Sequence, residues 1–276
     1  MFFILSGVFF LNCNPSSNTG NTNAKEDSTT IRNDSIAVDK KNTPALQPDK
    51  FRSIFEKGVD FLATGNEPFW SLEIDFDKSI HFKPLSGFEM NTPIVEGVKA
   101  ADANVTRYQA NTEKGVLIVQ IQKMKCINDM SGEELEYRVT IDTKNNTDKD
   151  YTTYKGCGRY LSDYRLHDIW VLDSIGNKKM QTTDFTKGLP QMEFNLTEKR
   201  IFGSTGCNSI NGVIEVLGKK IQFGRLATTR MACPDMSFES AYLQKLDNKT
   251  VPYQIKPGKL YLLVSPDSVF VYKKID

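Results

Sequence analysis

The sequence predicts a mainly β protein with a minor helical part: two small antiparallel β-sheet or open-barrel domains, the second with one packed helix. Aromatic residues make up 11% of the chain, and they favour pleated, half-buried surfaces over long helices. Several short stretches alternate apolar and polar residues with a period of two, as strands with one wet face do. Gly, Asn, Asp and Lys residues of the kind found in turns separate these stretches.

The N-terminus has the pattern of a processing signal. Residues 2–11 form an almost unbroken apolar run, which is too short to span a bilayer as a helix but has the length of a signal-peptide core. Leu11 stands two residues before Cys13, an arrangement that resembles a bacterial lipobox. The resemblance implies a lipoprotein signal peptide over residues 1–12 and lipid attachment to Cys13. A cleaved secretory peptide with Cys13 as a bystander is the alternative.

Residues 13–50 are predicted to be a lipidated, disordered tether. They are rich in Asn, Ser, Thr, Asp, Lys and Pro and bury too little apolar surface to offset their ordering entropy. A flexible segment of this length reaches roughly 30 to 36 Å, enough to hold a folded body clear of a membrane. We expect the protein in the cell envelope, attached to a membrane through its lipid. The residue after Cys13 is Asn14 and not an acidic residue of the kind that acts as a retention signal. By resemblance to bacterial lipoproteins, this favours the outer membrane.

The charge balance excludes one class of partner. The chain has 35 basic and 34 acidic residues and a formal net charge of +1. It has no block of like charge that would follow a phosphate backbone, so we expect no nucleic acid as a partner.

The cysteines favour export and disulfide bonds. If Cys13, one of five cysteines, is the lipid site, four remain, and they divide two and two between the domains as Cys126, Cys157, Cys207 and Cys233. None has the close paired spacing of a zinc or redox site. Four cysteines allow three pairings, and four buried free thiols are a further alternative. We take the pairing within each domain as the hypothesis, because each bridge then lies inside one cooperative unit.

The first domain is expected over residues 51–163. Residues 69–76 place Trp70, Leu72, Ile74 and Phe76 on one face of a strand. Similar runs follow at residues 105–110, 116–123 and 137–141. An antiparallel meander or barrel is the natural assembly.

Three motifs distinguish this first domain: Gly-Asn-Glu-Pro-Phe-Trp at residues 65–70, Cys-Ile-Asn-Asp-Met-Ser-Gly at 126–132, and Tyr-Lys-Gly-Cys-Gly at 154–158. Together they resemble an uncharacterised bacterial envelope domain that is often fused to a META domain. Gly65 and Asn66 are predicted to form a turn and Trp70 to enter the core. Glu67 is either a site carboxylate or a solvated turn residue.

The second domain is expected over residues 164–276. Trp170 lies in an apolar run, and residues 192–197 alternate as a strand. Further strands are predicted at residues 213–217 and 220–223, and a closing hairpin at 260–264 and 268–272. Between them an amphipathic helix begins at Ser237, the candidate N-cap, with Phe238, Tyr242 and Leu246 on its apolar side.

Two further motifs distinguish the second domain. Residues 203–212 read Gly-Ser-Thr-Gly-Cys-Asn-Ser-Ile-Asn-Gly, and residues 228–234 read Thr-Thr-Arg-Met-Ala-Cys-Pro. With the helix that follows, they resemble the META domain of HslJ-type heat-shock lipoproteins over residues 166–273. The resemblance implies a small β-fold with one packed helix, and a role in heat shock and tolerance of hydrophobic antibiotics. Gly206, Asn208 and Arg230 are the motif residues considered for binding.

The sequence offers little support for catalysis. Its two histidines, His81 and His167, lie in different domains and form no zinc-binding pair. No phosphate loop, dinucleotide fingerprint or nucleophile elbow is present. Cys207 as a nucleophile would need His167 as its base, and a paired structural cysteine is the alternative. We therefore predict a protein that is not an enzyme and has no metal and no cofactor.

Three functions remain open on this basis. The first is a non-catalytic envelope stress lipoprotein. The second is a binding module for a lipid or another envelope lipoprotein, with Phe194, Phe223 and Tyr242 either lining a gap for an acyl chain or filling the core. The third is an inhibitor of a periplasmic, lysozyme-type hydrolase. An apolar cavity favours the second function, and a rigid loop carrying polar groups favours the third.

Overall fold

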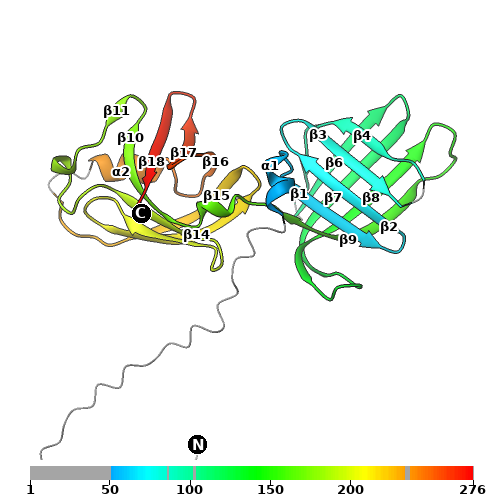
Figure 1. Cartoon of the computed structure of the whole chain (residues 1–276), viewed down its shortest axis with the longest axis horizontal. Helices are drawn as coiled ribbons and strands as arrows, with labels where there is room; N and C mark the ends of the chain where they lie inside the picture. The colour runs from blue at the N-terminus through cyan, green and yellow to red at the C-terminus, as the bar shows by residue number, and fades with distance from the viewer. Residues whose placement is uncertain (1–50, 86, 102–103, 234–236, 276) are drawn as a thin grey trace, which may run out of the picture. The chain divides into compact units, whose positions relative to one another are not determined.

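The computed structural model describes residues 51–275 apart from 86, 102–103 and 234–236. Most of these residues are in strands, and the strands form two separate nine-stranded sheets (Figure 1). The mainly β fold class is therefore confirmed. The predicted signal peptide of residues 1–12, the lipid site Cys13 and the predicted tether of residues 13–50 lie outside the described residues.

The first sheet follows a short helix, α1 (Arg52–Glu56), and is antiparallel throughout. Its order is β4-β3-β2-β1-β9-β8-β7-β6-β5, so that β4 and β5 are edge strands and the sheet is an open half-barrel. The strands are β1 (Phe61–Asn66), β2 (Phe69–Asp75), β3 (Ser79–Pro84), β4 (Met90–Pro93), β5 (Val98–Lys99), β6 (Val105–Thr112), β7 (Gly115–Ile127), β8 (Glu134–Asn145) and β9 (Thr152–Tyr160).

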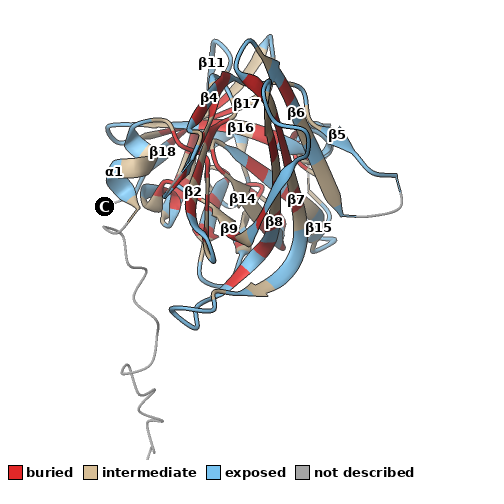
Figure 2. Cartoon of the chain, turned by 90° about the vertical axis from the view of Figure 1, so that its right-hand side faces the viewer, coloured by how far each residue is buried: buried red, intermediate tan, exposed pale blue. Residues whose placement is uncertain are grey.

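Period-two alternation places the core of the first sheet. Trp70, Leu72 and Ile74 of β2 are buried, as predicted. Phe76 is only half-buried, because β2 ends at Asp75 and the alternation ends with it. Figure 2 shows buried and exposed positions alternating along β7 and β8. One face of the sheet therefore holds the apolar core and the other meets water.

The second sheet closes into a barrel. Its order is β11-β10-β12-β13-β14-β15-β16-β17-β18, and β10 also pairs with β18. Short 3-10 helices, η1 (Tyr164–Leu166) and η2 (Thr182–Asp184), accompany it. The strands are β10 (Ile169–Ile175), β11 (Lys178–Lys179), β12 (Gln191–Asn195), β13 (Arg200–Ser204), β14 (Ser209–Leu217), β15 (Lys220–Thr228), β16 (Thr250–Lys256), β17 (Lys259–Ser265) and β18 (Ser268–Lys274).

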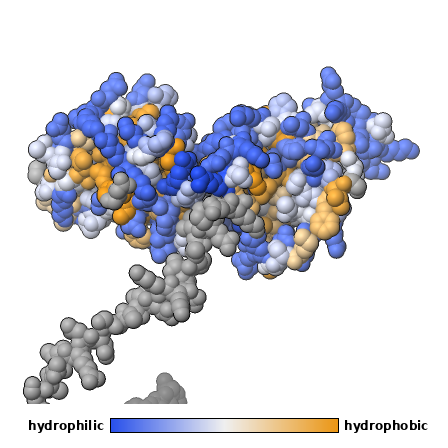
Figure 3. All heavy atoms as spheres, viewed as in Figure 1, coloured by the Kyte–Doolittle hydropathy of each residue, from blue (hydrophilic) through white to orange (hydrophobic). Residues whose placement is uncertain are grey.

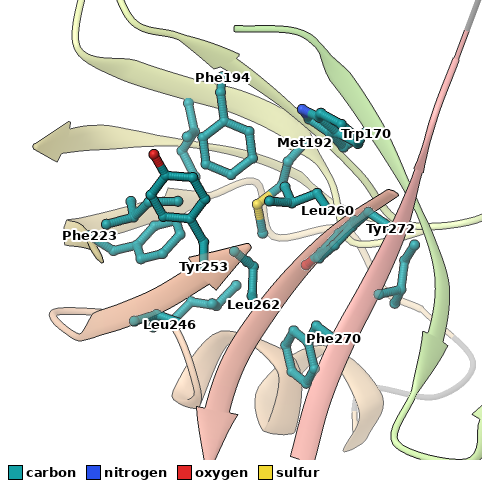
Figure 4. Packing of buried hydrophobic residues seen from close by; sticks show 14 of the residues in the cluster. Trp170, Met192, Phe194, Phe223, Leu246, Tyr253, Leu260, Leu262, Phe270 and Tyr272 are labelled. Carbon is teal, nitrogen blue, oxygen red and sulfur yellow. The ribbon is translucent and has the colours of Figure 1, made fainter. Parts of the chain in front are cut away.

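Large side chains fill the interior of the second sheet (Figure 4). Trp170, Met192 and Phe194 enter from β10 and β12, and Tyr272 enters from β18. Each has at most 1% of its surface exposed. Packing of this density leaves little room for a ligand among these residues.

The predicted amphipathic helix is present as α2 (Ser237–Gln244), but it is shorter than its apolar spacing suggested. Tyr242 is buried in the core, as expected. Leu246 is fully buried as well, but from the turn that follows the helix. The backbone N–H of Leu246 donates to the carbonyl of Leu243, a three-residue step that tightens the chain at the helix end.

The two sheets divide the described chain between Tyr160 and Ile169. The predicted domain boundary after Asp163 falls in this interval and stays a prediction, since both sheets belong to one compact unit. Hydrophilic side chains cover most of the face in Figure 3, and apolar ones gather in a few separate areas. Among the described residues, no helix is long and apolar enough to cross a membrane.

Candidate functional site

The three sequence motifs of the first sheet meet at one place. Asn66 Nδ2 donates a hydrogen bond of 3.0 Å to Asn128 Oδ1. Trp70 Nε1 donates one of 3.3 Å to the carbonyl of Lys155. A disulfide joins the second and third motifs. We call residues 65–70, 126–132 and 154–158 the motif cluster.

The prediction that Gly65 and Asn66 form a turn is wrong. Gly65 is required instead for close packing. Gly65 and Asn66 both lie in β1, and the turn is formed by Glu67 and Pro68. A Cβ atom on Gly65 would lie 2.1 Å from Trp70 Nε1 and 2.5 Å from the carbonyl oxygen of Lys155. Only glycine lets the indole pass so close to β1.

Glu67 and Trp70 have different surroundings although they belong to one motif. Trp70 is 4% exposed and packs with its ring centroid 6.0 Å from that of Phe82. Glu67 is exposed at the tip of the turn. Glu67 is therefore a solvated turn residue. The prediction that Trp70 enters the core is confirmed.

Both disulfides have the pairing within each domain. Cys126 is bonded to Cys157, with Cα atoms 5.5 Å apart. Cys207 is bonded to Cys233, with Cα atoms 6.3 Å apart. These distances are ordinary for disulfides. The alternative of four free thiols, and Cys207 as a nucleophile, both lose their basis in this structure.

In the second sheet, Asn208 joins three segments of the chain. Its Oδ1 accepts hydrogen bonds from Thr229 Oγ1 at 2.9 Å and from the N–H of Met231 at 2.8 Å. Its Nδ2 donates to both carboxylate oxygens of Glu239, at 3.1 and 3.0 Å. Asn208 is fully buried. An asparagine beside glycines commonly satisfies a local turn, but the side-chain hydrogen bonds of Asn208 reach residues 21 to 31 positions away.

Glu239 is the residue that sequence reasoning missed. It lies in the first turn of α2, and only 7% of its surface is exposed. Thr205 Oγ1 and Asn208 Nδ2 donate to its carboxylate. No ion pair of Glu239 occurs within the described ranges, so neutral donors stabilise the carboxylate. We call Thr205, Asn208 and Glu239 the buried polar cluster. Acidic residues near the start of a helix are ordinarily at the surface, so no local pattern indicates that Glu239 is buried.

Gly206 and Arg230 flank this cluster. Gly206 has a φ of +91°, and a Cβ atom there would lie 2.4 Å from the ring of Phe185. Glycine is therefore favoured here for two reasons: it adopts the positive φ easily, and it has no Cβ atom to clash with Phe185. Arg230 is exposed beside Met231. The two motifs of the second sheet thus meet around the Cys207–Cys233 bond, with Arg230 on the outside.

The aromatic residues considered for an acyl chain fill the core. Phe194, Phe223 and Tyr242 are each at most 1% exposed. The hydroxyl groups of Tyr242 and Tyr272 lie 2.9 Å apart inside the barrel. Burial raises the pKa of both tyrosines well above the ordinary value, so both hydroxyls stay protonated.

Two open surface pockets lie within single sheets. One, of about 220 Å³, lies beside the Cys207–Cys233 bond and is lined by Phe185, Phe238 and Glu239. The other, of about 560 Å³, lies at the edge strand β4 and the turn after β6. Polar and apolar atoms line both, so neither resembles the enclosed apolar site that an acyl chain prefers.

The histidines have structural partners. His81 Nε2 lies 2.7 Å from Glu89 Oε1. His167 Nδ1 accepts a hydrogen bond of 3.0 Å from the N–H of Leu196. Within the described ranges, no three His, Cys, Asp or Glu side chains are grouped to hold a metal ion.

Comparison with known proteins supports a C-terminal META domain: residues 166–275 match it. META domains are not a known enzyme family. Two solved structures are similar at 22% identity over 40% of this chain. One is an NMR structure of which 90% is covered, with a TM-score of 0.33. The other, an NMR structure from Burkholderia xenovorans, is covered to 85% with a TM-score of 0.34. No curated protein shows significant similarity to the chain.

Proposed function

We propose that this chain is a non-catalytic, lipid-anchored protein of the bacterial cell envelope. It is held through Cys13, in the outer membrane, and acts by binding in envelope stress and in tolerance of hydrophobic antibiotics. The META domain at residues 166–275 supports an envelope-associated, non-catalytic role in general. The apolar run before Cys13 and the polar residues 14–50 support export and anchoring.

The non-catalytic part of this proposal rests mainly on the Cys207–Cys233 bond, and two further contacts agree with it. The sulfur of Cys207 is bonded to Cys233 and is no thiol. His167, the only base considered for it, is engaged by Leu196. Asn208 and Glu239 bind each other. The distinctive residues therefore fix the shape of loops, and fixed loops support recognition.

A second candidate is the binding module for a lipid or lipoprotein partner. The loop between β7 and β8 is held by the Cys126–Cys157 bond, and a loop held in this way also suits an inhibitor of a polar hydrolase site. The loop exposes the polar residues Asp129 and Ser131, but its large exposed side chains are the apolar ones of Ile127 and Met130. Large exposed apolar side chains favour an apolar partner.

A deletion strain tests the proposed function. We expect it to survive heat less well and to be more sensitive to hydrophobic antibiotics. The wild-type gene should restore tolerance, and a Cys13→Ser gene should not, because the product is no longer held at the membrane. Full tolerance in the deletion strain contradicts the stress role. Steady hydrolysis of an envelope substrate by the purified chain contradicts the non-catalytic role.

A further inference from the structure

Four large apolar side chains are exposed around the motif cluster. Phe69 is 45% exposed, Leu85 77%, Ile127 56% and Met130 70%. We call these four residues the apolar rim. The fold does not need them, because none belongs to the core of the first sheet.

Hydrogen bonds bring the rim residues to the same end of the sheet. The N–H of Leu85 donates to the carbonyl of Phe69 at 2.7 Å. Phe69 is paired with Asn66, whose amide binds Asn128. Asn128 Oδ1 also accepts from the N–H of Met130 at 3.1 Å. The loop after β1 and the loop after β7 therefore lie side by side.

Covalent and hydrogen bonds hold the loop that carries part of the rim in place. The exposed rim side chains therefore belong to a fixed structure and not to a mobile loop. The Cys126–Cys157 bond fixes the base of the loop that carries Ile127 and Met130. The loop closes on itself through the N–H of Asn128, which donates to the carbonyl of Glu133 at 2.9 Å. Figure 2 shows the hairpin of β7 and β8 exposed at its tip. Fixed, exposed apolar groups on loop tips lose little entropy when they are buried against a partner.

The charges beside the rim are largely compensated. Glu133 forms an ion pair of 2.7 Å with Arg159, and Glu134 one of 2.5 Å with Lys125. Glu67 and Asp129 at the loop tips and Lys155 of β9 also remain exposed. A partner that offers apolar surface without strong net charge fits this arrangement.

The first described residue, Phe51, lies beside a residue that binds the loop after β7. The Arg159 guanidinium, which pairs with Glu133 of that loop, lies 4.9 Å from the ring centroid of Phe51. The chain toward the proposed lipid site Cys13 therefore leaves the described residues two contacts away from the loop that carries Ile127 and Met130.

We infer that the apolar rim docks on the surface of the phospholipid bilayer and buries Phe69, Leu85, Ile127 and Met130 at the level of the headgroups. The proposed lipid on Cys13 determines which membrane the rim meets, and to that extent the inference rests on the proposed function. The affinity of the rim for lipid is a property of the described residues alone. Loops with aromatic and aliphatic tips bind membranes through the apolar area that they bury.

Vesicle sedimentation tests this with the chain from residue 13 carrying Cys13→Ser. That chain keeps every described residue but lacks the apolar run and the lipid site. We expect it to sediment with vesicles of phosphatidylethanolamine containing some phosphatidylglycerol. Phe69→Ser and Met130→Ser should each weaken binding about tenfold, the loss expected from one large side chain that is no longer buried. Phe202→Ser is the matched control, because Phe202 is 36% exposed on the second sheet.

A fluorescent label gives a second measurement that does not depend on affinity. An environment-sensitive dye on Met130→Cys should shift to shorter wavelength with vesicles, whereas the same dye on Phe202→Cys should not. Binding should persist at high salt and should not grow with the phosphatidylglycerol content, because the exposed charges of the motif cluster, Glu67, Asp129 and Lys155, have both signs.

Three results would overturn the inference: no sedimentation of the parent chain, equal effects of Phe69→Ser and Phe202→Ser, or binding that disappears at high salt. The last would mean electrostatic association. The proposed anchoring fails separately. If Cys13 carries no lipid in cells, vesicle binding of this chain is unaffected, and if the rim does not bind, lipid on Cys13 is still detected.

Discussion

Replacing Asn208 by alanine is expected to destabilise the second sheet by about 3 to 5 kcal/mol. The substitution removes the two hydrogen bonds that Asn208 Nδ2 donates to the buried Glu239 carboxylate, which keeps only Thr205 Oγ1 as a donor. It also removes the acceptor of Thr229 Oγ1 and the Met231 N–H. A buried carboxylate that loses most of its hydrogen bonds is destabilised. Urea unfolding followed by a probe of the second sheet measures the change as a lower midpoint at constant slope.

Asn211→Ala is the matched control for this prediction. Asn211 is exposed on β14, and its Oδ1 accepts one hydrogen bond of 3.3 Å from Arg200. Its loss should change stability by less than about 0.5 kcal/mol. The double variant Asn208→Ala with Glu239→Ala should be less destabilised than the sum of the two single variants, because the buried charge is gone. Additive effects would show that Asn208 and Glu239 do not interact as described.

Removing either disulfide is expected to destabilise its own sheet by about 2 to 5 kcal/mol and to spare the other. The bonds join residues 31 and 26 positions apart, and the chain-entropy model gives each loop about 3 kcal/mol. The variants are Cys126→Ala with Cys157→Ala, and Cys207→Ala with Cys233→Ala, so that no free thiol is left behind. Unfolding followed separately in the two sheets measures the effect.

Peptide mapping without reduction provides the control for the disulfide variants. Wild-type protein should give one peptide linking Cys126 to Cys157 and another linking Cys207 to Cys233. A peptide that links Cys126 to Cys207, or four free thiols in the exported protein, contradicts the pairing. Equal destabilisation of both sheets by one double variant would contradict the expectation that each bridge stabilises only its own sheet.

The strands could be predicted from the sequence because their alternation is a local property. Trp70, Leu72 and Ile74 are buried as the period of two required. The closing hairpin of β17 and β18 also lies where alternation placed it. The pairing of β10 with β18, which closes the second barrel, joins residues about a hundred positions apart. No local pattern carries that information.

The candidate site could be predicted less well, because its residues meet through long-range contacts. The cysteine pairing could be predicted from the division into two domains. The burial of Trp70 could be predicted from the alternation of its strand. Glu239 could not be found, since an acidic residue in the first turn of a helix is ordinarily explained by the helix dipole. The bond between Asn66 and Asn128 could not be found either, because it depends on two loops lying side by side.

Lipid anchoring at Cys13 can be tested through the mass and the location of the mature protein. We expect the protein to fractionate with membranes and its N-terminal peptide to begin at an acylated Cys13. Cys13→Ser should yield an unlipidated protein that washes off, because rim contacts without an acyl chain are reversible. A Cys13→Ser protein that stays membrane-bound after washing, with the same mature mass as the wild-type protein apart from the substituted atom, would contradict lipid anchoring at Cys13.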